Sequence, residues 1–152
     1  MANMKTIFDE TTRDELIRRI NMLNVNTKAQ WGKMNLNQML KHFIFWDESV
    51  LGKRKLKQPL IGKLFGKFFL RKLIKDDTPL PHSLPSVDEL KVEEGINSDL
   101  SVEKKKWISL IKEYPKLSNH TYELPFFGEV KKEHAGYLAY KHTDHHLRQF
   151  YG

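Results

Sequence analysis

The chain has 152 residues, 39% of them apolar, which is enough to bury one hydrophobic core and too few for two comfortable ones. It contains no cysteine, which excludes disulfides, thiolate zinc sites and a cysteine nucleophile. The net charge of +7 is uneven, because nine of the 26 Lys and Arg lie between residues 53 and 75, where there is no acid, and the rest of the chain holds 17 basic and 19 acidic residues.

We therefore expect a single domain over residues 1–152. The first ten residues lack the apolar core of a signal peptide, and no run reaches the roughly 18 apolar residues of a membrane span, so we expect a cytoplasmic protein. Any transition-metal site must be built from His, Asp and Glu.

The first two helices are predicted from capping patterns that precede apolar stripes. Thr12 and Glu15 have the form of a capping box, which predicts a helix over about 12–24. A second capping pattern begins at Asn35 and predicts a helix over about 35–51.

His42 lies on the second predicted helix, at the border of its broad apolar face. Successive residues turn by about 100°, which places His42 about 40° from Trp46. A lone histidine in such a position is more often a packed or hydrogen-bonded side chain than a ligand, because imidazole is intermediate in burial. Only a partner site elsewhere in the chain would make it a ligand.

Residues 52–75 form a basic segment whose apolar side chains fall on one stripe of a helix that Gly62 and Gly66 weaken. The stripe consists of Leu60, Ile61, Leu64, Phe65, Phe68 and Phe69. One reading is a helix that lies on an anionic membrane surface, and another is a patch that binds phosphate or nucleic acid. We favour a third, an insertion that folds its aromatic side over the core and leaves its lysines in water, because charge runs are usually solvated faces.

The region that follows is predicted as a loop and then a third long helix. Three prolines make 76–87 an extended loop, in which His82 is expected to be a solvated side chain. Ser98 or Asp99 caps the helix, and Pro115 brings it to an end.

Residues 116–129 are predicted as a loop, and a last helix covers about 130–150. On this helix His142 and His146 lie about 40° apart on the inward face beside two alanines, whereas His145 points elsewhere. Two imidazoles four residues apart offer two nitrogen ligands to one ion. The helix lacks the Glu of the metalloprotease motif. A histidine-rich exposed helix end remains the alternative.

The C-terminal segment 140–150, Tyr-Lys-His-x-Asp-His-His-Leu-Arg-Gln-Phe, is similar to the signature of one branch of the DinB-like superfamily (DinB/YfiT-like), a set of mostly uncharacterised bacterial proteins. Three upstream stretches fit the same branch in the same order: Trp-Gly-Lys-Met at 31–34, Gln-Met-Leu-x-His at 38–42 and Pro-x-Phe-Gly at 125–128. The resemblance spans most of the chain, and the basic segment 52–75 is its vaguest part.

The resemblance implies an all-α four-helix bundle with a long basic insertion and loops over 52–97, between the second and third bundle helices. It also implies a divalent metal held by one histidine of the second helix and two of the last, which here are His42, His142 and His146. The other four histidines match no ligand position: His82, His120, His134 and His145. Leu124 stands where the family commonly has a histidine, so no site role is assigned there.

Three neutral imidazoles leave a bound ion its full charge and an open coordination position, which is typical of a catalytic site. Zn, Ni, Fe and Cu all accept nitrogen ligands, and the sequence does not choose among them. No general base is identified. Asp144 faces away from His142 and is expected to pair with Arg148, and Asp47 is expected in a surface ion pair. The alternative for either carboxylate is a hydrogen bond to one of the metal-binding histidines.

The resemblance implies a metal-dependent enzyme, either a hydrolase or a transferase of a small thiol onto electrophiles. The expected partner is then a small-molecule substrate, a thiol or an electrophile, and a homodimer is left open. The alternative is a non-catalytic bundle that metal stabilises and that serves in binding. Association with a membrane surface or nucleic acid through 53–75 is kept as a third, less favoured reading.

Overall fold

The computed structural model describes residues 3–84, 91–93 and 98–151, which form five α-helices and one two-stranded sheet. The helices are α1 (Glu10–Met22), α2 (Leu36–Val50), α3 (Leu60–Leu73), α4 (Leu100–Ile111) and α5 (Lys132–Gln149). The strands β1 (Thr121–Leu124) and β2 (Gly128–Lys131) form an antiparallel pair just before α5. The fold is therefore mostly helical.

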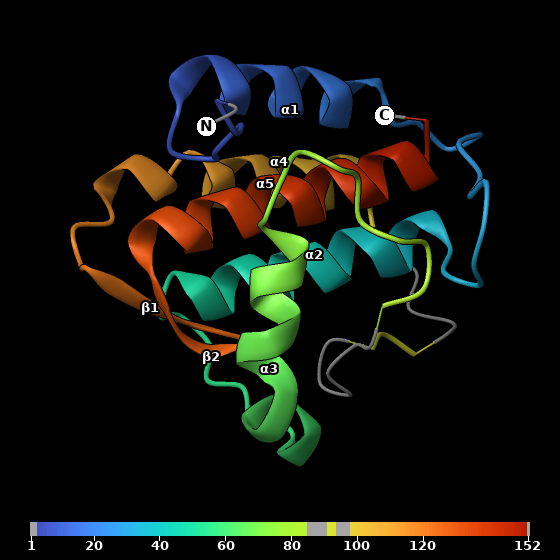
Figure 1. Cartoon of the computed structure of the whole chain (residues 1–152). Coiled ribbons are helices and arrows are strands. Elements are labelled where there is room, and N and C mark those ends of the chain that lie inside the picture. The colour runs from blue at the N-terminus through green and yellow to red at the C-terminus, as the bar shows by residue number, and fades with distance from the viewer. Residues whose placement is uncertain (1–2, 85–90, 94–97, 152) are drawn as a thin grey trace.

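Helices α1, α2, α4 and α5 run alongside one another, and α3 is set crosswise to them (Figure 1). The core lies between the four aligned helices. Leu16 of α1, Phe43 of α2, Trp107 of α4 and Leu147 of α5 are all fully buried there. The rings of Phe43 and Trp107 stack with their centroids 4.6 Å apart. Burial of such large apolar side chains is the main force that holds the helices together.

Two of the predicted helix starts are confirmed and one is wrong. Asn35 forms a capping box at the start of α2 with the glutamine three residues later, and Asp99 caps α4. Helix α1, however, begins earlier than predicted. Asp9 is its N-cap and accepts a hydrogen bond from the Thr12 amide, so Thr12 and Glu15 do not form the predicted capping box.

The predicted loop 116–129 contains β1 and the start of β2, so the all-α prediction fails for these residues. Side chains alternate across the sheet, with Tyr122, Leu124 and Val130 buried and the intervening glutamates exposed. The strands push the start of the last helix to Lys132, two residues later than predicted.

Helix α3 confirms that the basic segment contains a helix, but the predicted orientation of its apolar stripe is wrong. Gly62, Gly66 and Leu70 are the buried residues, whereas the bulky side chains of Phe65 and Phe68 are exposed. The glycines allow the helix backbone to approach the turn between β1 and β2, where a Cβ at Gly62 would lie 2.2 Å from a backbone oxygen.

Lys141 of α5 fixes the other end of α3. Its side chain is buried, and its Nζ donates hydrogen bonds to the carbonyls of Leu73 and Asp76. A cation at a helix C-terminus satisfies carbonyls that have no partner within the helix. Burial lowers the pKa of Lys141.

The predicted extended loop 76–87 has no helix or strand as far as residue 84, and its remaining residues lie outside the described part. Among the described residues, none of the helices combines the length and the apolar character that crossing a membrane requires.

Candidate metal centre

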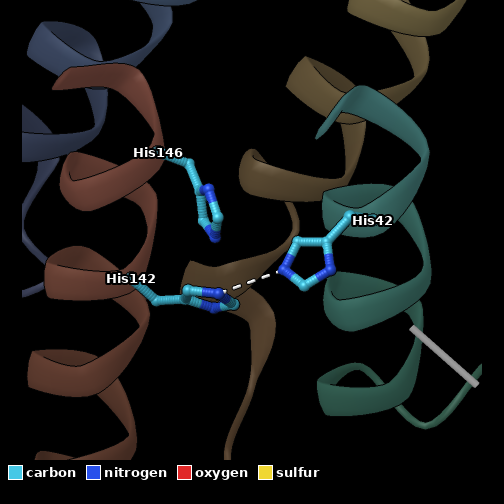
Figure 2. Close-up of side chains that lie close together, drawn as sticks. All are labelled: His42, His142 and His146. Atoms are coloured by element: carbon cyan, nitrogen blue, oxygen red, sulfur yellow. Dashed lines mark hydrogen bonds between the residues drawn. The ribbon is translucent and has the colours of Figure 1, made fainter. Parts of the chain in front are cut away.

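The three histidines that the sequence predicts as a set lie together between α2 and α5. His42 comes from α2, and His142 and His146 come from the last two turns of α5 (Figure 2). Each offers a ring nitrogen, and these nitrogens all lie within 4.8 Å of one another. His42 Nε2 and His142 Nε2 are 3.2 Å apart, although the two residues are 100 positions apart in the sequence.

Aromatic side chains surround the three imidazoles. The ring of His142 lies 4.8 Å from that of Phe43 and 4.9 Å from that of Trp46, both on α2. His42 itself is buried, while His142 and His146 are half-buried. Only this set among the described residues forms such a cluster of His, Asp or Glu. No carboxylate of the described residues joins this set.

The low polarity of this environment keeps the imidazoles of His142 and His146 neutral. Burial, and next the neighbouring His146 and His42, lower the pKa of His142 well below its usual range. Burial, followed by the effect of His42, lowers the pKa of His146 to about 3. At neutral pH these rings therefore carry lone pairs that can bind a cation.

A chain of hydrogen bonds orients His146. Its Nδ1 lies 2.7 Å from Gln149 Oε1, and Gln149 Nε2 donates to the carbonyl of Trp31 over 2.8 Å. Because the amide presents its oxygen, His146 Nδ1 is the donor and Nε2 keeps the free lone pair. Figure 2 shows one ring nitrogen of His146 pointing toward the other two rings. Such outer hydrogen bonds fix the tautomer of metal-binding histidines.

Gly32 makes this hydrogen-bond chain sterically feasible. Its φ is +76°, a conformation that L side chains rarely adopt, and a Cβ there would lie 2.8 Å from Gln149 Nε2. The Trp-Gly-Lys-Met stretch at 31–34 therefore supports the orientation of His146 and is not itself part of the cluster.

The histidine cluster lines a cavity of about 290 Å³. Most of the wall is apolar or aromatic and comes from five regions, represented by Trp31, Phe69 of α3, Leu80, Phe127 in the turn after β1 and Leu138 of α5. A cavity of this size, with a few polar groups in an apolar wall, suits a small molecule.

Two histidines outside the set also line this cavity. His145, predicted to match no ligand position, is buried, and its ring lies 4.9 Å from that of His146. Burial lowers the pKa of His145, although a hydrogen bond with the Leu80 backbone opposes the effect. His82 is exposed as predicted, but it is more than a solvated side chain, because it stacks on Trp31 with ring centroids 3.9 Å apart.

The structure corrects one carboxylate prediction and confirms another. Asp47 is fully buried and accepts hydrogen bonds from Trp107 and Tyr114, so the predicted surface ion pair is wrong. Asp144 does pair with Arg148 at 2.7 Å, as predicted, and also with Arg19 of α1 at the same distance. Neither carboxylate belongs to the histidine cluster.

The donor set fits a transition metal. Three nitrogens bound at about 2.0–2.1 Å to one tetrahedral ion lie roughly 3.3 Å apart, close to the separation of His42 and His142. Neutral imidazole donors suit Zn, Ni, Fe or Cu better than Mg or Ca. The three histidines can therefore hold a metal ion, whose identity this geometry does not select.

Sequence reasoning assigned no role to Gln149, His145 or Trp31, which the structure places around the cluster. A signal for Gln149 was present, because it lies three residues after His146 and therefore on the same side of the helix. No local signal linked Trp31 to the last helix, since that contact spans 118 positions.

Comparison with known proteins gives one finding. A family model described as "Protein of unknown function (DUF1569)" matches residues 3–152. No curated protein and no solved structure matches the chain.

Proposed function

Because the chain belongs to the DUF1569 family, whose function is unknown, we propose its role from the geometry of the site. The protein is a metal-dependent enzyme that acts on a small molecule in the cavity beside His42, His142 and His146. The observation that carries this proposal is the convergence of three ring nitrogens within 4.8 Å of one another in the wall of an apolar cavity.

The number of ligands in the cluster, three histidines among the described residues, favours a catalytic over a structural role. Structural zinc sites usually fill all four positions with protein ligands, whereas three protein ligands leave one position for water or substrate. When bound, such an ion supplies Lewis-acid chemistry and lowers the pKa of a water or thiol at its open position.

The chain supplies binding and orientation around this position. His146 is held by Gln149, and the aromatic wall excludes water from the apolar part of a substrate. The indole N–H of Trp31 is buried and has no acceptor among the described residues, so a substrate acceptor in the cavity would satisfy it. His145, whose pKa burial lowers and whose ring lies 4.9 Å from that of His146, is a candidate to accept a proton.

Two reaction classes fit this arrangement, hydrolysis and transfer of a small thiol onto an electrophile. Both need a nucleophile whose pKa is lowered and an electrophile held beside it. The apolar wall favours a substrate with an aliphatic or aromatic portion.

We extend the proposal to the fold relationship. Helices α1, α2, α4 and α5 form the four-helix bundle of the DinB-like superfamily, with the sheet and α3 added to it. Support comes from the origin of the histidines, one from the second helix and two from the last. The match to the DUF1569 family does not itself connect that family to the DinB-like superfamily. A single domain, a cytoplasmic location, a bacterial origin and a homodimer stay predictions.

The test is metal content in two matched variants. Wild-type protein, His142→Ala and His145→Ala are each incubated with Zn, Ni or Fe, desalted and measured by elemental analysis. We expect about one ion per chain in the wild type and in His145→Ala, and none in His142→Ala. His145 is the control because it lies on the same helix and lines the same cavity. Equal metal content in all three proteins would disprove the site.

A non-catalytic, metal-stabilised protein is the second candidate. The observation in its favour is that the cluster joins α2 to α5, so that metal would tie two helices together. Loaded protein is tested with a small thiol plus an aromatic electrophile, and with an activated ester. Turnover that His142→Ala abolishes supports the enzyme, and full metal content without turnover across both substrate classes supports the second candidate.

A further inference from the structure

Helix α3 presents a stripe of bulky apolar side chains to solvent. Nine large hydrophobic side chains of the described residues are exposed, and five of them belong to this one helix. Their exposed fractions are 72% for Leu60, 52% for Ile61, 68% for Leu64, 52% for Phe65 and 65% for Phe68. A contiguous apolar surface of this kind usually marks an interaction site.

Of the predicted stripe, only Phe69 packs inward, with its ring centroid 6.0 Å from that of Phe126, and the five exposed side chains lie away from the main attachment of α3. Gly62 and Gly66 lie on the opposite face and pack against the backbone of Phe126. Gly66 and Phe68 are two residues apart, which is a rotation of about 200° around the helix axis, so they lie on nearly opposite sides of α3. The helix thus has two apolar faces, a flat one of small residues that contacts the protein and a bulky one that faces outward.

The charges within the segment that carries the stripe are all positive. Residues 53–75 contain nine Lys and Arg and no acid. Lys63 and Lys67 lie on one flank of the stripe, and Arg71 and Lys72 lie within its angular range, one turn beyond Phe68; all four are exposed. Lys67 also donates a hydrogen bond to the Glu129 carbonyl. An apolar stripe flanked by cations is the arrangement of helices that lie in the interface of anionic membranes.

We propose that the outward face of α3 binds an anionic membrane surface, with the bulky stripe inserted among the lipid chains and the flanking lysines at the headgroups. The site is peripheral and does not span the bilayer. Figure 1 shows α3 projecting from the four aligned helices, so its outward face is accessible to a flat surface.

The same observations argue against two other occupants. A nucleic acid backbone would pair with the cations but would leave the five apolar side chains without a contact. A second copy of the chain would cover the apolar stripe but would bring two sets of cations together with no acid in either segment. Of these three occupants, only an anionic lipid surface matches both the apolar stripe and the positive charge beside it.

Binding is tested by flotation of the full chain with vesicles of phosphatidylcholine alone, and with vesicles in which about 30% is replaced by phosphatidylglycerol. The protein is expected to float with the anionic vesicles only, and the bound fraction should fall as NaCl rises from about 50 to 500 mM. No flotation with anionic vesicles at the lowest salt would overturn the proposal.

The contribution of the apolar stripe to vesicle binding is tested with Leu64→Gln combined with Phe68→Gln. Gln is chosen because it has a high helix propensity. The matched control combines Met22→Gln with Val102→Gln, two exposed positions on α1 and α4. We expect the α3 pair to weaken partitioning by at least about tenfold and the control pair to leave it unchanged. Equal binding by both pairs would contradict the proposal.

The contribution of the α3 lysines to vesicle binding is tested in the same way. Lys63→Gln combined with Lys72→Gln should reduce binding and its salt dependence, whereas Lys105→Gln combined with Lys112→Gln, which removes two exposed lysines from the α4 region, should not. Circular dichroism and metal content must match the wild type in every variant, which separates this test from that of the proposed enzyme.

Two results would assign the face to another occupant and thereby reject the proposal. Binding to duplex DNA or RNA that survives the Leu64 and Phe68 changes, without flotation, would indicate nucleic acid. A dimer in lipid-free sedimentation velocity that these two changes dissociate would indicate a second copy of the chain.

Discussion

Asp47 is a carboxyl group held in an apolar core. It is completely inaccessible to solvent and lies 2.6 Å from Tyr114 Oη and 3.0 Å from Trp107 Nε1. Burial raises the pKa of Asp47 to about 7, even though both hydrogen bonds act to lower it. At neutral pH this group is therefore close to the midpoint of its titration in the folded protein.

This raised pKa makes folding stability depend on pH. The folded state binds an extra proton between about pH 4 and 7, so stability is greatest below this window and falls as pH rises, by at most about 1.4 kcal/mol per unit. Asp47→Asn mimics the neutral acid. We expect the free energy of unfolding of the wild type, minus that of the variant, to decrease as pH rises across this window and to stay constant above it.

The measurement is urea unfolding of both proteins with a chelator present. Subtraction cancels the histidines, whose lowered pKa values act in the opposite direction, removing stability as pH falls. A difference that stays constant from about pH 4 to 8 would show that Asp47 keeps an ordinary pKa.

Gln149 is the residue whose loss should affect metal binding without removing a ligand. Gln149→Leu deletes the acceptor for His146 Nδ1–H and should weaken metal affinity by about 10–100-fold. Gln149→Glu keeps the acceptor for His146 but loses the donor to the Trp31 carbonyl, so it should retain more affinity than Gln149→Leu and less than the wild type. Competition against a chromophoric chelator measures both, with Gln30→Leu as an exposed control. Equal affinity in the Leu and Glu variants would show that the hydrogen bond has no such role.

At the scale of elements, the position of α3 depends on its two buried glycines. A Cβ on Gly62 would lie 2.2 Å from the Phe126 carbonyl oxygen, and one on Gly66 would lie 2.9 Å from the same atom. Phe126 itself has a φ of +70°, which is unfavourable for a bulky residue, and Gln58 donates a hydrogen bond to its carbonyl. Helix and turn therefore hold each other in place.

Gly62→Ala tests this contact by the sign of its effect. Helix propensity alone predicts that the free energy of unfolding increases by up to about 1 kcal/mol. The close contact with Phe126 predicts instead that it decreases by about 1–3 kcal/mol. We expect the decrease, measured by thermal and urea unfolding. Lys63→Ala is the control because it changes the next, exposed position of the same helix. A more stable Gly62→Ala variant would contradict this packing.

At the scale of the whole molecule, the histidine cluster joins parts of the chain that are distant in sequence. His42 and His142 are 100 residues apart, and each lies on a helix of the core. A metal that binds only the folded arrangement must stabilise it by mass action, by about 2.7 kcal/mol at a free concentration 100 times the dissociation constant.

We therefore expect saturating metal to raise the melting temperature of the wild type by several degrees and that of His145→Ala by a similar amount. His142→Ala should show no increase. Differential scanning calorimetry with and without chelator measures this difference. An equal shift in His142→Ala would mean that the metal binds elsewhere.

The sequence alone determined the features that depend on local spacing. Asn35 predicted the start of α2, and the four-residue spacing of His142 and His146 placed both imidazoles on one side of α5, because a helix repeats every 3.6 residues. His42 could be chosen only through the family resemblance, since its position on a single helix favoured ordinary packing. The strands were missed because four residues are too few to show a clear alternation.

Only the tertiary structure decided the features that depend on what packs against a face. Asp47 lies on the same side of α2 as the buried Phe43 and Ile44, but only the tertiary structure brings Trp107 and Tyr114 to it as hydrogen-bond donors. On α3, the pattern favoured burial of the bulky stripe, but the flat glycine face makes the contact because only a face without side chains can approach the backbone of Phe126. Periodicity identifies the faces of a helix, and the neighbouring element determines which of them is buried.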